Sequence, residues 1–316
     1  MQRLILSLAA SLCLIALLGT AKPAHAARAT FVSGNGDDNA NCLTPDTACR
    51  EITAALPKTD PFGTVHVLSG EYGAFPINQS VDILAESGAA SVLHGFVDVP
   101  GGGFGAVVIT GDPIVRLRGL VLNNSSAGIV VVGAAILHLE NSVLVNANTD
   151  FSIDFRPTSS SELYVSGTIL SGAGNGGGGV RIKPTGSGSA KVVLDNVNVE
   201  DNPTGILIDG RSTTGSNTVT IRNSTISGST TFGVYAADSG GGATNVTVEG
   251  STSANNTTFG VGASGTNATV RVRNSTVNGN GTGLQIASSG KIISHSGNVV
   301  AGNTTNGAFT STVAQQ

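Results

Sequence analysis

The sequence contains no tryptophan, one methionine and three cysteines, and only 11% of its 316 residues are charged. Its formal net charge of −4 at pH 7 argues against a nucleic-acid backbone as a partner, because that partner attracts basic surfaces. So few charges together with 44 glycines could indicate disorder, but a hydrophobic fraction of 40% is too high for a disordered chain. Serine, threonine, asparagine and valine fill most of the rest, and the β-branched residues recur in short alternating runs that favour strands.

Long hydrophobic runs are also missing, with one exception at the start of the chain. Residues 4–18 are apolar and follow a basic start at Arg3. They precede Ala24-His25-Ala26, a small-x-small triplet of the kind that signal peptidase accepts. We therefore expect a signal peptide over residues 1–26 and a product that is secreted or periplasmic. The run is short for a membrane span and nothing later approaches one, so no span is expected in the mature chain.

Only two cysteines would remain after cleavage, Cys42 and Cys49. In an exported protein, an isolated close pair more often forms a disulfide than a metal site. No histidine neighbours the pair, and the other mature histidines are scattered over different expected strands: His66, His94, His138 and His295. We therefore expect a disulfide and no metal site.

One unit of roughly 23–28 residues repeats along the chain, in the size class of stacked solenoid units. Its first copy opens with Gly-Ile-Val-Val-Val at residues 128–132, and later copies open at Ser152, Gly179, Gly205, Gly233, Gly260 and Gly283. A second alternating strand follows in each copy, and then a fixed Asn or Gly: Asn141, Gly167, Asn196, Asn223, Gly250, Asn274 and Gly297. Three residues later comes another apolar position, with Ser253 as the exception.

Alternation with period two sends successive side chains to opposite faces of a strand. Three short strands per turn, with each turn stacked on the last, would bury one aliphatic column and pair every backbone in parallel. Asn suits the bends because it tolerates left-handed backbone and can bond to its equivalent in the next turn.

A different pattern precedes the repeats. At residues 44–56, Pro45 can begin a helix that Thr44 or Asp46 caps, Ile52 and Leu56 share a face, and Pro57 ends the run. The expected short helix would cover the open end of the column. We therefore divide the mature chain into an N-terminal cap with the cysteine pair (residues 27–63) and a solenoid (residues 64–316).

This whole arrangement resembles bacterial secreted right-handed parallel β-helix proteins, which have the pectate-lyase-like fold and no established activity. The resemblance covers essentially the entire mature chain. It implies an all-β fold of roughly nine or ten turns and a rod of roughly 45 Å at the usual strand spacing.

Two short motifs resemble those of polygalacturonases: Asn148-Thr149-Asp150 and Arg181-Ile182-Lys183. That family also carries an Asp-Asp pair and Gly-His-Gly between the two motifs, and both are missing here. Inverting glycosidases need a general acid and a general base that are far enough apart to hold the attacking water between them. Asp150 alone therefore cannot supply this activity. By repeat alignment, Val180 and Ile182 point inward, while Arg181 and Lys183 point to solvent. We expect replacement of both cations by Ser to leave stability nearly intact.

Stacking places outward residues of successive first strands in columns. One column is Asp154, Arg181, Leu207 and Tyr235, and the next is Arg156, Lys183 and Asp209, with Arg211 in the adjoining turn. Seven of these form the candidate substrate-binding set: Asp154, Arg156, Arg181, Lys183, Asp209, Arg211 and Tyr235. The cations could bind uronate carboxylates. The alternative is a structural role only, in which the charges form solvated salt pairs between turns. Ca²⁺ is conceivable, but paired acids are not evident, so no cofactor is expected.

Two functions remain open. The favoured one is an exported, monomeric, non-catalytic β-helix protein with a surface, matrix or carbohydrate-binding role, and acidic polysaccharide as the candidate partner. The alternative is a polysaccharide lyase or glycoside hydrolase that acts on acidic polysaccharide. Short loops suggest a bare rod without walls around the charged face.

Overall fold

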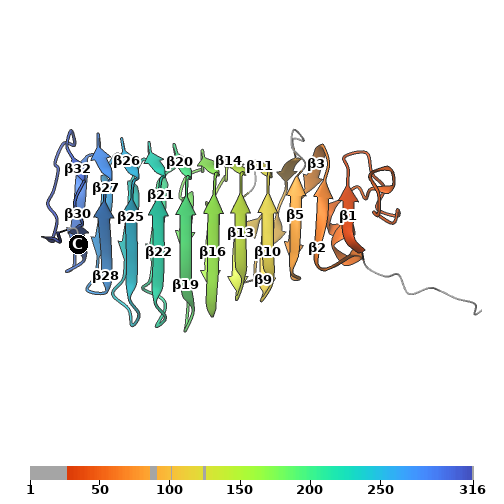
Figure 1. Ribbon diagram of the computed structural model, residues 1–316, viewed down its shortest axis with the longest axis horizontal. Coiled ribbons are helices and arrows are strands. Elements are labelled where there is room, and N and C mark those ends of the chain that lie inside the picture. Colours follow the sequence, from red (N-terminus) through yellow and green to blue (C-terminus); the bar gives the residue numbers. More distant parts are fainter. Residues whose placement is uncertain (1–26, 86–90, 101, 124–125, 315–316) are drawn as a thin grey trace, which may run out of the picture.

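The computed structural model describes residues 27–85, 91–100, 102–123 and 126–314. The predicted signal peptide lies outside the described residues. The described residues form three parallel sheets that wind around one core as a right-handed parallel β-helix. The N-terminal cap and the C-terminus lie at opposite ends of the rod (Figure 1). No helix in these four ranges is both long and apolar enough to span a membrane.

Each turn contributes one strand to each sheet in chain order. The twelve-stranded sheet, which faces the reader in Figure 1, contains β1 (Ala27–Val32), β2 (Thr59–Val67), β5 (Val81–Ala85), β10 (Ile114–Arg118), β13 (Ile136–Glu140), β16 (Ser160–Ser166), β19 (Ser189–Asp195), β22 (Asn217–Arg222), β25 (Thr244–Glu249), β28 (Ala268–Arg273), β31 (Lys291–Ser294) and β33 (Ser311–Thr312). The ten-stranded sheet contains β3 (Gly70–Gly73), β6 (Ser91–His94), β11 (Val121–Asn123), β14 (Val143–Val145), β17 (Ile169–Ser171), β20 (Asn198–Glu200), β23 (Thr225–Ser227), β26 (Thr252–Ala254), β29 (Thr276–Asn278) and β32 (Val299–Val300). The nine-stranded sheet contains β4 (Phe75–Ile77), β9 (Val107–Gly111), β12 (Ile129–Gly133), β15 (Phe151–Pro157), β18 (Gly178–Ile182), β21 (Thr204–Asp209), β24 (Phe232–Ala237), β27 (Phe259–Ser264) and β30 (Thr282–Ala287).

The repeats predicted from sequence correspond to turns of the rod. The seven predicted unit starts fall at the seven successive strands β12 to β30 of the nine-stranded sheet, which are the regular part of the solenoid. The ten-stranded and nine-stranded sheets agree with the expected nine or ten turns. One strand of the predicted cap, β1, already pairs with β2 and so forms the first rung of the twelve-stranded sheet.

The core is the aliphatic column that alternation predicted. Val180, Ile182, Ile206 and Ile208 are all fully buried and stack in line through β18 and β21. Six of the seven units open with a glycine, and Ser152 opens the other; the glycine is required because it faces this column. A Cβ on Gly233, for example, would lie 2.3 Å from the Oγ of Ser253.

Every fixed Asn or Gly at the bend after the twelve-stranded sheet has a positive φ, between 48° and 68°, as the sequence predicted. Left-handed backbone is costly for most L-residues, so only Asn and Gly recur at this corner. A second column of asparagines closes the turn before the nine-stranded sheet. There the Oδ1 of Asn280 accepts from the backbone N–H of Asn256 (2.9 Å), and the Oδ1 of Asn303 accepts from that of Asn280 (2.9 Å). These bonds satisfy backbone donors that burial would otherwise leave unpaired.

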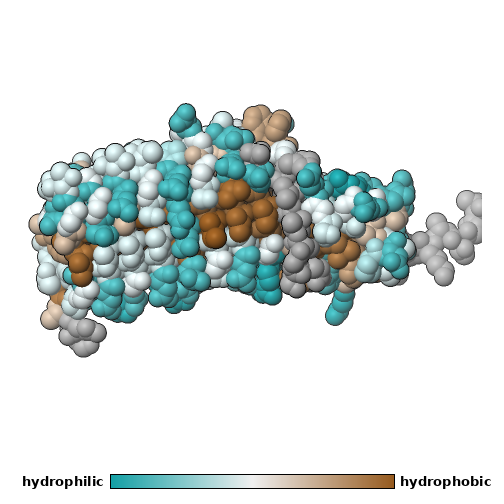
Figure 2. Space-filling model, turned by 90° about the horizontal axis from the view of Figure 1, so that it is seen from above, coloured by the Kyte–Doolittle hydropathy of each residue, from teal (hydrophilic) through white to brown (hydrophobic). Residues whose placement is uncertain are grey.

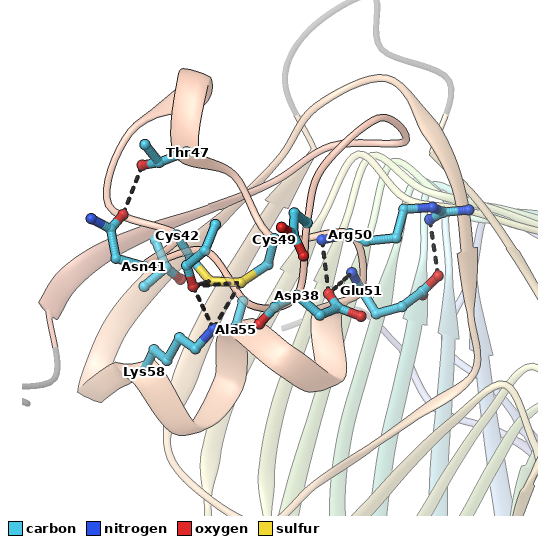
Figure 3. Close-up of a disulfide and its surroundings, with 12 residues drawn as sticks. Asp38, Asn41, Cys42, Thr47, Cys49, Arg50, Glu51, Ala55 and Lys58 are labelled. Carbon is cyan, nitrogen blue, oxygen red and sulfur yellow. Dashed lines mark hydrogen bonds and ion pairs between the residues drawn. A yellow bond between two sulfur atoms is a disulfide. The ribbon is translucent and has the colours of Figure 1, made fainter.

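The cap contains the predicted disulfide between Cys42 and Cys49, whose Cα atoms are 5.0 Å apart (Figure 3). The Lys58 ammonium donates to the backbone oxygen of Ala40 (2.7 Å) and to the Sγ of Cys49 (3.3 Å). Asp38 accepts from the backbone N–H groups of Arg50 and Glu51, both at 2.8 Å. These contacts hold the cap together, and two others join it to the solenoid: Arg50 donates from Nη1 to Glu71 O (2.8 Å), and Glu51 Oε2 accepts from the backbone N–H of Gly73 (2.8 Å).

The cap helix is real but shorter than residues 44–56. It is divided into a 3-10 turn η1 (Pro45–Thr47), which Thr44 caps, the helix α2 (Ile52–Ala55) and a second 3-10 turn η2 (Leu56–Lys58). The helix is interrupted because Cys49 makes a parallel bridge with Val32 of β1, which holds that residue extended.

The outer surfaces of the sheets differ in character. Seen from above, Figure 2 shows a hydrophobic patch near mid-rod over the ten-stranded sheet. Val121, Val143 and Ile169 stack there in one column, beside Val145, and the side chain of Ile169 is exposed. The twelve-stranded sheet instead carries columns of ion pairs between turns, such as Arg118 with Glu140 at 2.6 Å.

Candidate functional site

The predicted columns exist on the outer face of the nine-stranded sheet. Asp154 pairs with Arg181, Arg181 with Leu207, and Leu207 with Tyr235, in four successive turns. Val130 precedes Asp154 in the same column. The charged residues therefore interrupt an otherwise apolar line of outward side chains.

Asp154 is the centre of a buried ion cluster. Arg181 donates from Nε to its Oδ1 (2.8 Å) and from Nη2 to its Oδ2 (2.7 Å), and the Nε of Arg156 lies 2.7 Å from that Oδ2. The side chain of Asp154 is 0% exposed, while those of Arg181 and Arg156 are 21% and 20% exposed. The expectation that the side chain of Arg181 is freely exposed to solvent is therefore wrong, although the outward direction was predicted correctly. It points outward, but it lies flat over a carboxylate that it shields.

Two further contacts hold Arg181 in place. Its Nη2 lies 3.0 Å from the Oδ1 of Asp150, and its guanidinium carbon lies 4.7 Å from the ring centroid of Phe151. Burial by itself would lower the pKa of Arg181, but the hydrogen bonds and charge of Asp154, with those of Asp150, outweigh burial and raise it. A raised pKa works against Arg181 as a catalytic base.

A second ion pair lies two turns further along. Asp209, whose side chain is 6% exposed, accepts from the Nε (2.8 Å) and Nη2 (2.9 Å) of Arg211, whose side chain is 56% exposed. Burial favours a higher pKa for Asp209, but the Arg211 hydrogen bonds and the nearby charge of Lys183 lower it. Lys183 is half-buried, and its backbone N–H donates to Phe155 O at 2.8 Å, which continues the pairing beyond β18.

Three aromatic side chains gather beside these charges. Phe232 and Phe259 stack in adjacent turns with ring centroids 5.2 Å apart, and Tyr235 contacts them at 5.1 and 5.4 Å. All three side chains are half-buried. The rings of Tyr235 and Phe259 lie over Gly262, where a Cβ would be 2.9 and 2.5 Å from them. We call Phe232, Tyr235 and Phe259 the aromatic cluster.

Sequence reasoning found Tyr235 but missed its two partners. The signal was present: Thr-Phe-Gly-Val occurs at residues 231–234 and again at 258–261, one turn apart. Two phenylalanines at one repeat position, each just before the inward glycine, must stack when the turns stack.

The rod is not bare at the other end of this face, contrary to expectation. Strands β7 (Val97–Asp98) and β8 (Phe104–Gly105) form an antiparallel hairpin. Val99 packs there with Val108 and Val130 of the nine-stranded sheet, which buries their outward side chains. Arg156 donates from Nη1 to Gly102 O (3.3 Å), so the hairpin borders the ion cluster directly.

The arrangement suits binding better than acid–base chemistry. A general base must reach the proton that it removes, but Asp154 and Asp209 are almost completely covered by arginines. Within the described residues, no group of three His, Cys, Asp or Glu side chains is placed to hold a metal ion. The side chain of Asp150 is 25% exposed but is paired with Arg181, so the exposed chemistry of this face consists mainly of guanidinium groups, one ammonium and aromatic rings.

Comparison with known proteins identifies the architecture. The family description "Right handed beta helix region" matches residues 105–305, well over half of the chain. The A-module of the mannuronan C-5 epimerase AlgE4 of Azotobacter vinelandii is similar in structure, with 13% identity and a TM-score of 0.45, over 80% of this chain and 91% of that one. The pectate lyase Pel9A is similar with 16% identity and a TM-score of 0.40, over 91% of this chain and 78% of that one. No curated protein matches the sequence.

Proposed function

Because the chain belongs to the right-handed β-helix family, we propose that the outer face of its nine-stranded sheet binds a polysaccharide without cleaving it. The observation that carries the proposal is the aromatic cluster beside partly exposed cations on one continuous face. Ligand sites combine apolar and aromatic surface with a few polar groups that fix orientation. Sugar rings offer C–H faces to aromatic rings, and hydroxyl or carboxylate groups to guanidinium and ammonium donors.

The cations favour an acidic polysaccharide. The face carries four cations, Arg156, Arg181, Lys183 and Arg211, against the three carboxylates Asp150, Asp154 and Asp209. Arg211 lies close enough to Tyr235 for their charges to interact, and Lys183 lies near Asp209. Charge-assisted bonds to carboxylates are stronger than neutral ones. We assign Lys183 and Arg211 to the ligand, whereas Arg181 and Arg156 hold Asp154.

Catalysis is the second candidate. A lyase needs a free base on this face, and Lys183 is the one candidate among the residues named here that no carboxylate covers directly. The raised pKa of Arg181 and the burial of Asp154 argue against either of these two residues as the base.

We also propose export to an oxidising compartment, secreted or periplasmic, which the Cys42–Cys49 disulfide supports. Sequencing of the N-terminus of exported protein tests the expected cleavage after Ala26.

The test of binding uses a panel of neutral and acidic polysaccharides at low salt, with wild type, Lys183→Ser and Tyr235→Ala. Lys191→Ser is the matched control, because Lys191 lies on the twelve-stranded sheet with its side chain 61% exposed. We expect acidic polysaccharide to bind, salt to weaken it, and both face variants but not the control to reduce it.

The same samples are assayed for unsaturated products and reducing ends. Product formation that Lys183→Ser abolishes would establish the lyase reading instead. Binding that neither face variant alters would overturn the assignment of this face.

A further inference from the structure

A separate pocket lies on the twelve-stranded sheet, near the C-terminal end of the rod where β25 and β28 face the reader in Figure 1. Its volume is about 240 Å³, and its lining residues are Thr247, Glu249, Arg271, Arg273 and His295. They come from three successive turns: Thr247 pairs with Arg271 and Glu249 with Arg273, and His295 follows β31. The His295 N–H donates to Val272 O (2.8 Å), so His295 continues the Glu249–Arg273 column.

Elsewhere on this sheet, cations and carboxylates match between turns. Examples are Arg116 with Asp82, Arg118 with Glu140, Lys191 with Glu162 and Arg222 with Asp195. In the pocket, Arg273 pairs with Glu249, but Arg271 breaks the pattern. Within the described part of the chain, the side-chain acceptor that meets Arg271 is a neutral amide oxygen, Asn245 Oδ1, at 3.0 Å.

Positive charge therefore accumulates in this one region of an acidic chain. Among the pocket residues, Arg271 and Arg273 provide two positive charges against the single negative charge of Glu249, while the whole chain carries −4. Lys291 of β31 is exposed and pairs with Thr269, two positions before Arg271. Arg271 and Arg273 are two positions apart on one strand, so both project outward, roughly 7 Å apart. His295 flanks Arg273 at roughly the 4.8 Å spacing of neighbouring strands.

Two guanidinium groups and an imidazole around one pocket are suited to a small anion. Arginine presents a planar fork that matches the geometry of carboxylate, sulfate and phosphate oxygens. The volume lies just below the range of about 300–1,000 Å³ that holds drug-sized ligands. It therefore suits a single charged group or one acidic sugar unit better than a long segment.

We propose that Arg271, Arg273 and His295 form an oxyanion-binding site. The site takes a sulfate, phosphate or carboxylate group, with Arg271 as the main donor because it has no carboxylate to release. It lies on a different sheet from the proposed polysaccharide face and does not depend on that proposal.

Titration with sulfate, inorganic phosphate and glucuronate at low ionic strength tests the site, with chemical-shift changes as the readout. We expect at least one probe to shift signals of Arg271 and His295 in the wild type. Arg271→Gln should weaken binding roughly tenfold or more, since a charge-assisted hydrogen bond is lost. Glu249→Gln should tighten binding, because it removes the competing carboxylate and frees Arg273.

Arg118→Gln is the control, since Arg118 lies in the column of Glu249 and Arg273, towards the other end of the sheet, and has its own partner, Glu140. It should leave binding unchanged. The pattern of probes separates the sources: glucuronate binding indicates a uronate, and binding of sulfate or phosphate alone indicates a tetrahedral ester group. The proposal is overturned if no probe shifts these signals, or if folded Arg271→Gln binds as the wild type does.

Discussion

Removing Arg181 should destabilise the protein, although the residue lies on the outer surface of a sheet. Arg181→Leu removes the bidentate partner of Asp154, whose side chain is 0% exposed in the folded protein, and places an apolar side chain over the carboxylate. Breaking a buried ion pair by removing one partner typically costs about 3–5 kcal/mol of unfolding free energy. Because Arg156 still lies 2.7 Å from Asp154, we expect a loss near the lower end, about 3 kcal/mol.

The neighbouring residues offer a rescue. Val130 precedes Asp154 in the outward column and Leu207 follows Arg181. The double variant Asp154→Val, Arg181→Leu therefore makes this column continuously apolar. Replacement of a buried ion pair by well-packed apolar residues is often neutral or stabilising, so the double variant should lie within about 1 kcal/mol of wild type.

Denaturant unfolding of the four proteins in the cycle measures both quantities, provided that the m-values agree. Arg222→Leu is the control, because Arg222 and Asp195 form an equivalent pair between turns with side chains 49% and 30% exposed. That change should cost less than about 1 kcal/mol. If Arg181→Leu costs no more than Arg222→Leu, or if adding Asp154→Val does not restore stability, burial of Asp154 has no energetic consequence and the reasoning is wrong.

Three other changes test the core, the cap and the ionisation of a buried phenol. Ile206→Asp should prevent folding or cost several kcal/mol of unfolding free energy, since Ile206 is fully buried and the new charge has no partner. Circular dichroism and solubility measure this effect. A folded variant of normal stability would contradict the assignment of Ile206 to the core. Replacing Cys42 by Ser should cost about 2.5 kcal/mol in the chain-entropy model for a loop with a sequence separation of 7, and unchanged thermal unfolding would refute a structural role for the disulfide. Burial raises the pKa of Tyr72 to about 12, and its hydroxyl donates to Leu68 O at 2.6 Å. The contribution of Tyr72 to stability should therefore be constant below about pH 10 and be lost at roughly 1.4 kcal/mol per unit between pH 10 and 12, where the unfolded phenol ionises first; Tyr72→Phe should abolish this loss.

The solenoid could be predicted from the sequence because every turn repeats the same local physics. Alternation in Val180 and Ile182 fixes which side faces the core, and period fixes which residues stack. Both were confirmed, as was left-handed backbone at Asn196 and its equivalents. These features depend on neighbours that are close in sequence or one period away.

The burial of Asp154 could not be predicted in this way. Alternation correctly placed it outward, but its exposure depends on Arg181 and Arg156 folding over it. The β7–β8 hairpin was missed for a related reason, since a single glycine-rich insertion has no period to reveal it. Sequence predicted the positions on the face, but not the contacts above it.

The direction of the backbone hydrogen bonds also determines how the rod responds to force. They run between turns, along the length of the rod, and the N-terminal cap and C-terminus lie at opposite ends (Figure 1). Tension between the ends therefore opens hydrogen bonds turn by turn instead of shearing a whole sheet at once. The last strand, β33, is held by two residue pairs, whereas β1 at the other end pairs with β2 at five positions. Unwinding should start at the C-terminus, and each released turn of about 25 residues would supply up to roughly 85 Å of chain. A protein of this kind, anchored at both ends, would act as an extensible tether that lengthens stepwise under load.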